Sequence, residues 1–297
     1  MDKATNIVVV VSRSTDAGYV LHKAAAIARA TPQGASVHVV RVMFEDYVDQ
    51  LHLDPEKSQA LKRYLMQAEE EFLVDLVEDH RADFTDIETA TLWNKRVSDA
   101  VMNVADTFEA DLIIKSADPD SPHFPRHPDD WNLLREARCP VFLVKPEPWP
   151  ANASVVAAVN MADVEHAAMN RRILEAGALA ARSLPGKLHI VNALVQTKPL
   201  LTAAELGVDF ERLELDARAQ VTGDLNKVLK TLGIKGADLH ITSGLPATLV
   251  TSVADETDAA IVVVGTAGRK GISALIIGNT SETLLHTLHH DLLVLHV

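Results

Sequence analysis

Short runs of valine, isoleucine and leucine recur along the chain in the same order in its two halves. They occupy residues 6–11, 35–42, 85–93, 110–117 and 139–146, and again residues 153–160, 186–194, 237–244, 259–267 and 290–297. Apolar runs of this length are typical of parallel strands buried on both faces. Corresponding runs start between 147 residues apart (6 and 153) and 152 residues apart (85 and 237). The sequence therefore predicts that one domain has been duplicated.

Helical patterns separate most of these runs. Residues 15–31 and 162–184 follow the first run of each half, and longer charged stretches at residues 55–80 and 209–233 follow the second. Alternation of strands and helices predicts an α/β fold, with a five-stranded, mostly parallel, Rossmann-like sheet in each half and helices on both faces. Residues 145–154 contain three prolines and predict a stiff linker. We therefore expect two domains, residues 1–148 and 149–297.

Composition narrows the classes of function. The net charge is −13 and no long basic run is present, so neither nucleic acid nor an anionic membrane surface is expected as a partner. Cys139 is the only cysteine, which excludes an intrachain disulfide and a cysteine-rich zinc site and fits a reducing compartment. No apolar run approaches eighteen residues. These features predict a cytoplasmic protein.

A glycine-containing stretch at residues 265–282 lies between a predicted strand and a predicted helix. Gly265, Gly268 and Gly278 occur in it, and Arg269 adds a basic side chain. Ligands of open α/β sheets bind beyond the carboxyl ends of the strands, where glycine N–H groups and helix N-termini can hold phosphate. The spacing is neither that of a P-loop nor that of a dinucleotide fingerprint. A phosphate cradle and a plain strand–helix turn are both compatible with it.

The spacing Gly265-x2-Gly268-x9-Gly278 resembles the ATP-binding signature of the universal stress protein family. The similarity extends over essentially the whole chain, in the tandem (UspE-like) arrangement of the family. It implies two tandem universal stress protein domains packed as an intramolecular pseudo-dimer, with residues 139–145 paired with residues 291–297. Further assembly into a homodimer stays open.

The resemblance also implies a site for ATP with Mg²⁺ in the second domain. Carried over by position, the nucleotide-binding residues are Ala158, Val159, Asn160, Ile190, Val264, Gly265, Gly268, Arg269, Gly278, Asn279, Thr280 and Ser281. Asn160 replaces an acidic residue of the family, and Asn279 replaces a hydroxyl residue. In the first half Ser116 and Pro119 stand where the second half has Gly265 and Gly268. The first domain is therefore expected to be degenerate and to bind no nucleotide.

No catalytic residues are identified, since the sequence contains no nucleophile motif with a recognisable base. Clustered histidines (His123 and His127; His286, His289 and His290) are interpreted as surface residues rather than metal ligands. The expected function is a nucleotide-responsive sensor or regulator of the stress response. Two alternatives remain open: a scaffold without nucleotide that acts through protein partners or binds another small molecule, and a weak ATPase.

Overall fold

The computed structural model describes residues 4–12, 14–117, 128–162, 164–194, 209–266, 283–284 and 287–296. Each of the ten apolar runs contains a strand, as predicted. The strands are β1 (Asn6–Val10), β2 (Ser36–Met43), β3 (Asp86–Trp93), β4 (Leu112–Ser116), β5 (Val141–Val144), β6 (Ser154–Val159), β7 (Leu188–Leu194), β8 (Asp238–Ser243), β9 (Ala259–Gly265) and β10 (Asp291–Leu295).

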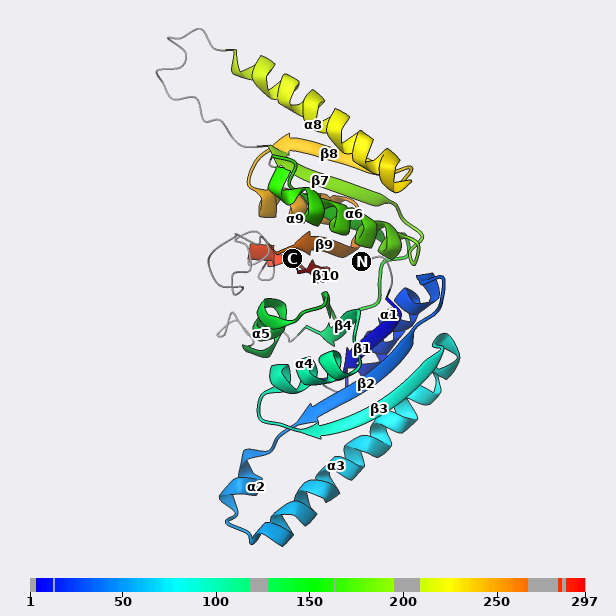
Figure 1. The fold of residues 1–297 in the computed structure, drawn as a ribbon, viewed down its shortest axis with the longest axis vertical. Coiled ribbons are helices and arrows are strands. Elements are labelled where there is room, and N and C mark those ends of the chain that lie inside the picture. The colour runs from blue at the N-terminus through cyan, green and yellow to red at the C-terminus, as the bar shows by residue number, and fades with distance from the viewer. Residues whose placement is uncertain are drawn as a thin grey trace.

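These strands form one ten-stranded sheet in the order β3-β2-β1-β4-β5-β10-β9-β6-β7-β8 (Figure 1). Neighbouring strands are parallel within each half of the sheet, whereas β5 and β10 are antiparallel, with Phe142 opposite Leu293. The predicted pairing of these two strands within one chain is therefore confirmed. Because the pairing is antiparallel, the strands of the two domains run in opposite directions, and their carboxyl ends lie at opposite edges of the sheet.

Helices cover both faces of the sheet. Those described are α1 (Ala17–Ala30), α2 (Asp46–Gln50), α3 (Pro55–Glu78), α4 (Val97–Thr107), α5 (Pro128–Glu136), α6 (Ala167–Ala181), α8 (Phe210–Leu232) and α9 (Pro246–Glu256), with 3-10 turns at Arg81–Asp83 and Val164–His166. Helices α1, α3, α6 and α8 contribute to the core on one face, and α4, α5 and α9 to the core on the other. The long helices α3 and α8 lie at the two ends of the molecule (Figure 1).

Side chains of each strand alternate between these two cores. Ile7 and Val9 of β1 enter the core beneath α1, whereas Val8 and Val10 enter the core beneath α4 and α5. This alternation explains why the strands read as continuous apolar runs, since both faces of the sheet are buried. Among the residues described, no helix combines the length and apolar character needed to cross a membrane.

Candidate functional site

The carboxyl ends of β6, β7 and β9 lie side by side, because these strands are parallel and β6 pairs with both of the others. Their last residues, including Val159 and Gly265, therefore share one edge of the sheet with Asn160. Six of the predicted nucleotide-binding residues lie outside the described part of the chain: Gly268, Arg269, Gly278, Asn279, Thr280 and Ser281. The structure thus defines the strand side of the candidate site.

A buried asparagine holds the turn that follows β6. Asn170, on the first turn of α6, is 5% exposed. Its Oδ1 accepts a hydrogen bond from Asn160 N at 2.9 Å, and its Nδ2 donates to Asn160 O at 2.6 Å. Because one side chain satisfies both backbone groups of Asn160, the backbone at the end of β6 has a fixed position.

A second asparagine supports the same turn from β7. Asn192 is 2% exposed, and its Oδ1 accepts a hydrogen bond from Met161 N at 2.8 Å. The exposed Asn160 side chain folds back on its own turn, where its Oδ1 accepts from Ala162 N at 3.1 Å. These contacts give the end of β6 a hydrogen-bonded support made of neutral side chains.

Gly265 ends β9 against helix α6. A Cβ at this position would lie 2.5 Å from both Cγ and Sδ of Met169 and 3.1 Å from Cδ1 of Ile173. Such distances are too short for a side chain unless Met169 moves. Close packing of α6 on β9 is therefore one physical reason for glycine at this position.

Other predicted site residues on the strands are buried. Ile190 is fully buried and Val264 is 3% exposed, so both contribute to the core rather than to an open surface. Val159 is also buried, whereas Ala158 is partly exposed. Among the predicted site residues that are described, those with exposed surface are therefore Ala158, Asn160 and Gly265.

Charged side chains fill the corresponding end of the first domain. Lys115, the last but one residue of β4, occupies the place that Val264 has in β9. Its buried Nζ lies 2.7 Å from Asp130 Oδ1 of α5 and donates to Ser116 O at 3.0 Å. The Ser116 hydroxyl donates to Asp16 Oδ2 at 2.8 Å. An ion pair with a buried lysine and a hydrogen-bonded carboxylate thus occupy the carboxyl end of β4.

A further carboxylate contacts the start of α4. Asp129 Oδ1 accepts a hydrogen bond from Ser98 N at 3.2 Å, so a side chain of the protein itself holds one N–H group at this helix N-terminus. Among the residues described, three aspartates therefore lie at this end of the first domain, and Asp130 pairs with Lys115 while Asp16 and Asp129 accept hydrogen bonds from Ser116 and Ser98. Their negative charge disfavours a polyphosphate ligand there.

The described histidines near the C-terminus lie outside a helix. His289 and His290 follow the last described helical residue, Thr287, and lie in the connection to β10. His290 Nε2 lies 3.7 Å from Asp255 Oδ1, and burial lowers the pKa of this histidine. His123, His127 and His286 lie outside the described residues. Among the residues described, no three or more histidine, cysteine, aspartate or glutamate side chains are grouped so that they could hold a metal ion.

The supporting residues Asn170 and Asn192 were not predicted from the sequence. A signal for both exists, because each is a polar residue at a position where the pattern requires burial. Asn192 interrupts the apolar run 188–194, and Asn170 precedes Ile173, Leu174 and Gly177 on the buried face of α6. Buried amides need hydrogen-bond partners, so such positions predict a local polar contact.

Comparison with known proteins gives a consistent result. A family model described as the universal stress protein family matches residues 3–145 and again residues 156–296. Universal stress protein E of Escherichia coli K12 is 34% identical over 217 residues, which cover 70% of this chain and 68% of that protein. The universal stress protein E homolog of Haemophilus influenzae is 24% identical over 300 residues, covering 98% of this chain and 97% of the homolog.

Solved structures agree over the whole chain. A universal stress protein of Pseudomonas aeruginosa UCBPP-PA14 superimposes with a TM-score of 0.71 at 27% identity, covering 99% of this chain and 94% of that one. A protein of unknown function from Pseudomonas aeruginosa PAO1 gives a TM-score of 0.73 at 26% identity, with coverage of 99% and 93%. The chain belongs to the universal stress protein family and carries two of its domains in tandem.

Proposed function

We propose that the second domain binds ATP with Mg²⁺ and that the protein acts as a nucleotide-responsive regulator of the stress response. The observation that carries the proposal is the chemical difference between the two carboxyl ends of the sheet. In the first domain Lys115 and Asp130 fill this end, whereas the second domain offers a neutral turn supported by Asn170 and Asn192. Of the two ends, as far as their residues are described, the second is therefore the better suited to a polyanion.

The family signature supplies the phosphate side of this proposed site. Gly268, Gly278 and the polar residues from Asn279 to Ser281 would provide N–H and hydroxyl donors to the phosphates. Mg²⁺ would be held chiefly by phosphate oxygens and water. A regulator of this kind would work in the cytoplasm, the reducing compartment that the single thiol fits.

Calorimetric titration with ATP and Mg²⁺ tests the proposal. Wild-type protein is expected to bind one nucleotide per chain, and Gly278→Val is expected to abolish binding because the added side chain blocks close approach of phosphate. Gly223→Val is the matched control, since Gly223 lies on α8 with open space where a Cβ would be placed. Absence of binding by the wild type, or binding that survives Gly278→Val, would contradict the proposal. Phosphate release in the same samples measures any weak ATPase activity.

One observation favours a second function, that of a scaffold without nucleotide. The Asn160 Oδ1 atom already accepts a hydrogen bond from Ala162 N, so the side chain that replaces the family's acidic residue is engaged within its own turn. A protein of this kind would act through protein partners. Purified protein that carries no nucleotide and does not bind it in the titration would support this alternative.

A further inference from the structure

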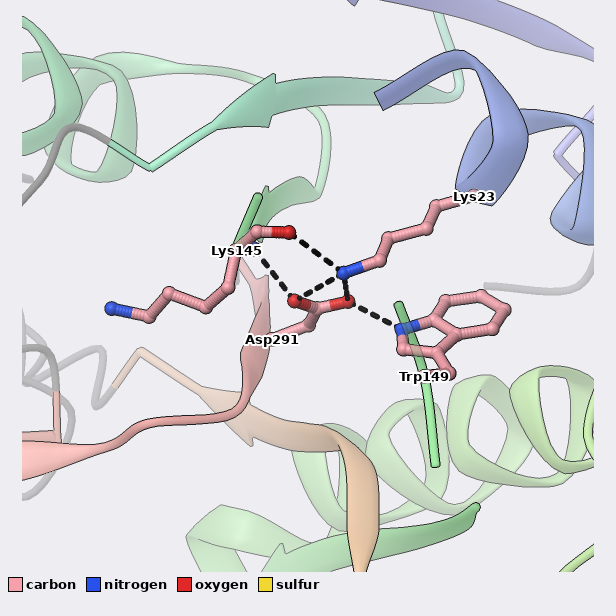
Figure 2. Close-up of polar contacts among 4 residues, drawn as sticks. All are labelled: Lys23, Lys145, Trp149 and Asp291. Atoms are coloured by element: carbon pink, nitrogen blue, oxygen red, sulfur yellow. Dashed lines mark hydrogen bonds and ion pairs between the residues drawn. The ribbon is translucent and has the colours of Figure 1, made fainter. Parts of the chain in front are cut away.

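A buried ion pair joins the two domains beside the contact between β5 and β10 (Figure 2). Lys23 Nζ, from α1 of the first domain, lies 2.8 Å from Asp291 Oδ2 and 2.9 Å from Oδ1. Asp291 is the first residue of β10, in the second domain. The exposed fractions of the two side chains are 3% and 2%. An interaction between residues 268 positions apart therefore links the domains within their shared interior.

Backbone and side-chain groups of the first domain and the linker complete the coordination of the carboxylate. Lys145 N donates to Asp291 Oδ1 at 2.7 Å, and Trp149 Nε1 donates to Oδ2 at 2.6 Å. Lys23 Nζ also donates to Lys145 O at 2.9 Å (Figure 2). These donors to the carboxylate all come from the first domain or the linker. The network therefore forms only where β10 of the second domain lies beside β5 of the first.

Stability alone does not account for this pair. Burial raises the pKa of Asp291 and lowers the pKa of Lys23, although each partner opposes the shift of the other. Desolvation in the interior thus opposes the charged form of each side chain. Buried ion pairs in proteins are often no more stabilising than apolar side chains of similar size, and their best-attested role is to specify register or partner.

The residues of the two strands are equally buried, so burial alone does not distinguish one pairing from another. All four residues of β5 and all five of β10 are buried, and Phe142 stands opposite Leu293 at the centre of the contact. An antiparallel contact of this kind has an approximate twofold axis at its centre. Each of two chains has one β5·β10 contact of its own. The two chains could therefore replace these contacts by two contacts between chains. One would be a β5·β5 contact, with Phe142 opposite Phe142, and the other a β10·β10 contact, with Leu293 opposite Leu293.

The charged residues distinguish these arrangements. Continuing the observed register by one residue sets Asp291 opposite Val144, whereas a β5·β5 contact would set Pro140 there. Each Lys23 amine would then lie beside a proline without the Asp291 carboxylate, with Glu147 as a remaining carboxylate that acts on it electrostatically. A β10·β10 contact would bring Asp291 near Arg172, which donates to His296 O at the far end of β10. The exchange is therefore unfavourable chiefly because the β5·β5 contact separates two Lys23 amines from their ion-pair partner.

We propose that the Lys23–Asp291 ion pair selects the pairing of β5 with β10 and prevents exchange into β5·β5 and β10·β10 contacts between two chains. The interface between the domains is thus specified by one buried charge from each side. Burial of the apolar residues of β5 and β10 stabilises the contact between the strands but does not select which strands pair.

A disulfide reporter on the full chain tests the selection. Leu293→Cys in a Cys139→Ser background leaves a single thiol, which faces Phe142 in the β5·β10 contact and faces the same thiol of a second chain only in a β10·β10 contact. The reporter protein is unfolded in urea, refolded at high protein concentration, oxidised and separated by non-reducing electrophoresis. Addition of Lys23→Met with Asp291→Leu is expected to increase the disulfide-linked dimer at least about tenfold, the equilibrium change for loss of roughly 1.4 kcal/mol of discrimination.

Arg29→Met with Asp83→Leu is the matched control, because it removes an ion pair that lies within the first domain. This control is expected to leave the dimer fraction unchanged. If the double variant of Lys23 and Asp291 does not refold, as judged by circular dichroism, Asp291→Asn supplies the same comparison with a nearly unchanged shape. An equal dimer fraction with and without the ion pair, or an equal rise in the control, would overturn the proposal.

Discussion

The buried pair at the domain junction also makes a prediction about stability, which a double-mutant cycle can measure. Lys23→Met alone leaves the Asp291 carboxylate in the interior with two N–H donors, and Asp291→Leu alone leaves a buried amine. Removal of one partner of a buried pair costs about 3–5 kcal/mol of the free energy of unfolding. We expect each single variant to lose stability in this range.

The double variant is expected to recover most of this loss. Replacing both charges by apolar side chains of similar volume is often neutral, or stabilising by about 1–4 kcal/mol. Against this gain, the Lys145 N–H loses its acceptor at a cost of about 1–3 kcal/mol, while the half-buried Trp149 retains access to water. The two terms nearly cancel, so the double variant should lie within about 2 kcal/mol of the wild type.

Urea unfolding followed by circular dichroism provides the four free energies of the cycle. Trp149 fluorescence adds a signal from the junction itself, because its indole donates to Asp291. The refuting result is additivity. If the double variant loses the sum of the two single losses, Lys23 and Asp291 contribute through independent packing contacts and not as a pair.

Two further predictions concern titratable side chains. His189 Nδ1 lies 3.1 Å from His240 Nε2, and burial, with His240 as a second cause, lowers the pKa of His189 below its ordinary value of 6.5. The neutral ring is therefore favoured in the folded state, so this contribution to stability is present above pH 6.5 and is lost as the pH falls through the lowered pKa. The melting temperature should fall less between pH 7.5 and pH 5 in His189→Gln than in the wild type, and an equal fall would contradict the assignment. Burial also raises the pKa of Cys139 to about 11. Because the thiolate is the reactive form, a thiol reagent at pH 8 should label the folded protein about 100-fold more slowly than the urea-unfolded protein. Equal labelling rates would show that this thiol is accessible.

The fold was predictable from the sequence because its signals are local. Each strand is a short apolar run, and the strand–helix alternation repeats in both halves with little change in spacing. Helix limits followed the same logic: Pro55 follows the capping residue Asp54 at the start of α3, and Gly233 ends α8 with a φ of 68°. Such signals depend only on residues that are neighbours in the chain, so they can be recognised in the sequence without the tertiary structure.

The polar contacts of the candidate site were less predictable, because they join distant segments. Asp16 and Ser116 are 100 residues apart, and Met161 and Asn192 are 31 apart. The sequence indicated that the first domain lacks the glycine loop, but it did not show that Lys115 and Asp130 fill the corresponding end. Partners of buried charges depend on the packing of helices on the sheet, which periodicity does not encode.

The opposite strand directions of the two domains determine which junction contacts lie near the proposed ligand. The carboxyl end of β5 and the amino end of β10 share one edge of the sheet, so the Lys23–Asp291 pair lies on the edge where β4 ends. The carboxyl ends of β9 and β10 share the other edge, where the proposed nucleotide would bind.

A different link joins the domains at that second edge. Arg172 of α6 donates to His296 O, and the His296 Nε2 atom lies 2.8 Å from Leu134 O, near the end of α5 in the first domain. Burial lowers the pKa of His296, so the neutral ring donates this hydrogen bond at neutral pH. The two domains are therefore linked at both edges of the sheet, by His296 and Leu134 at the edge where β9 ends and by the Lys23–Asp291 pair at the edge where β4 ends.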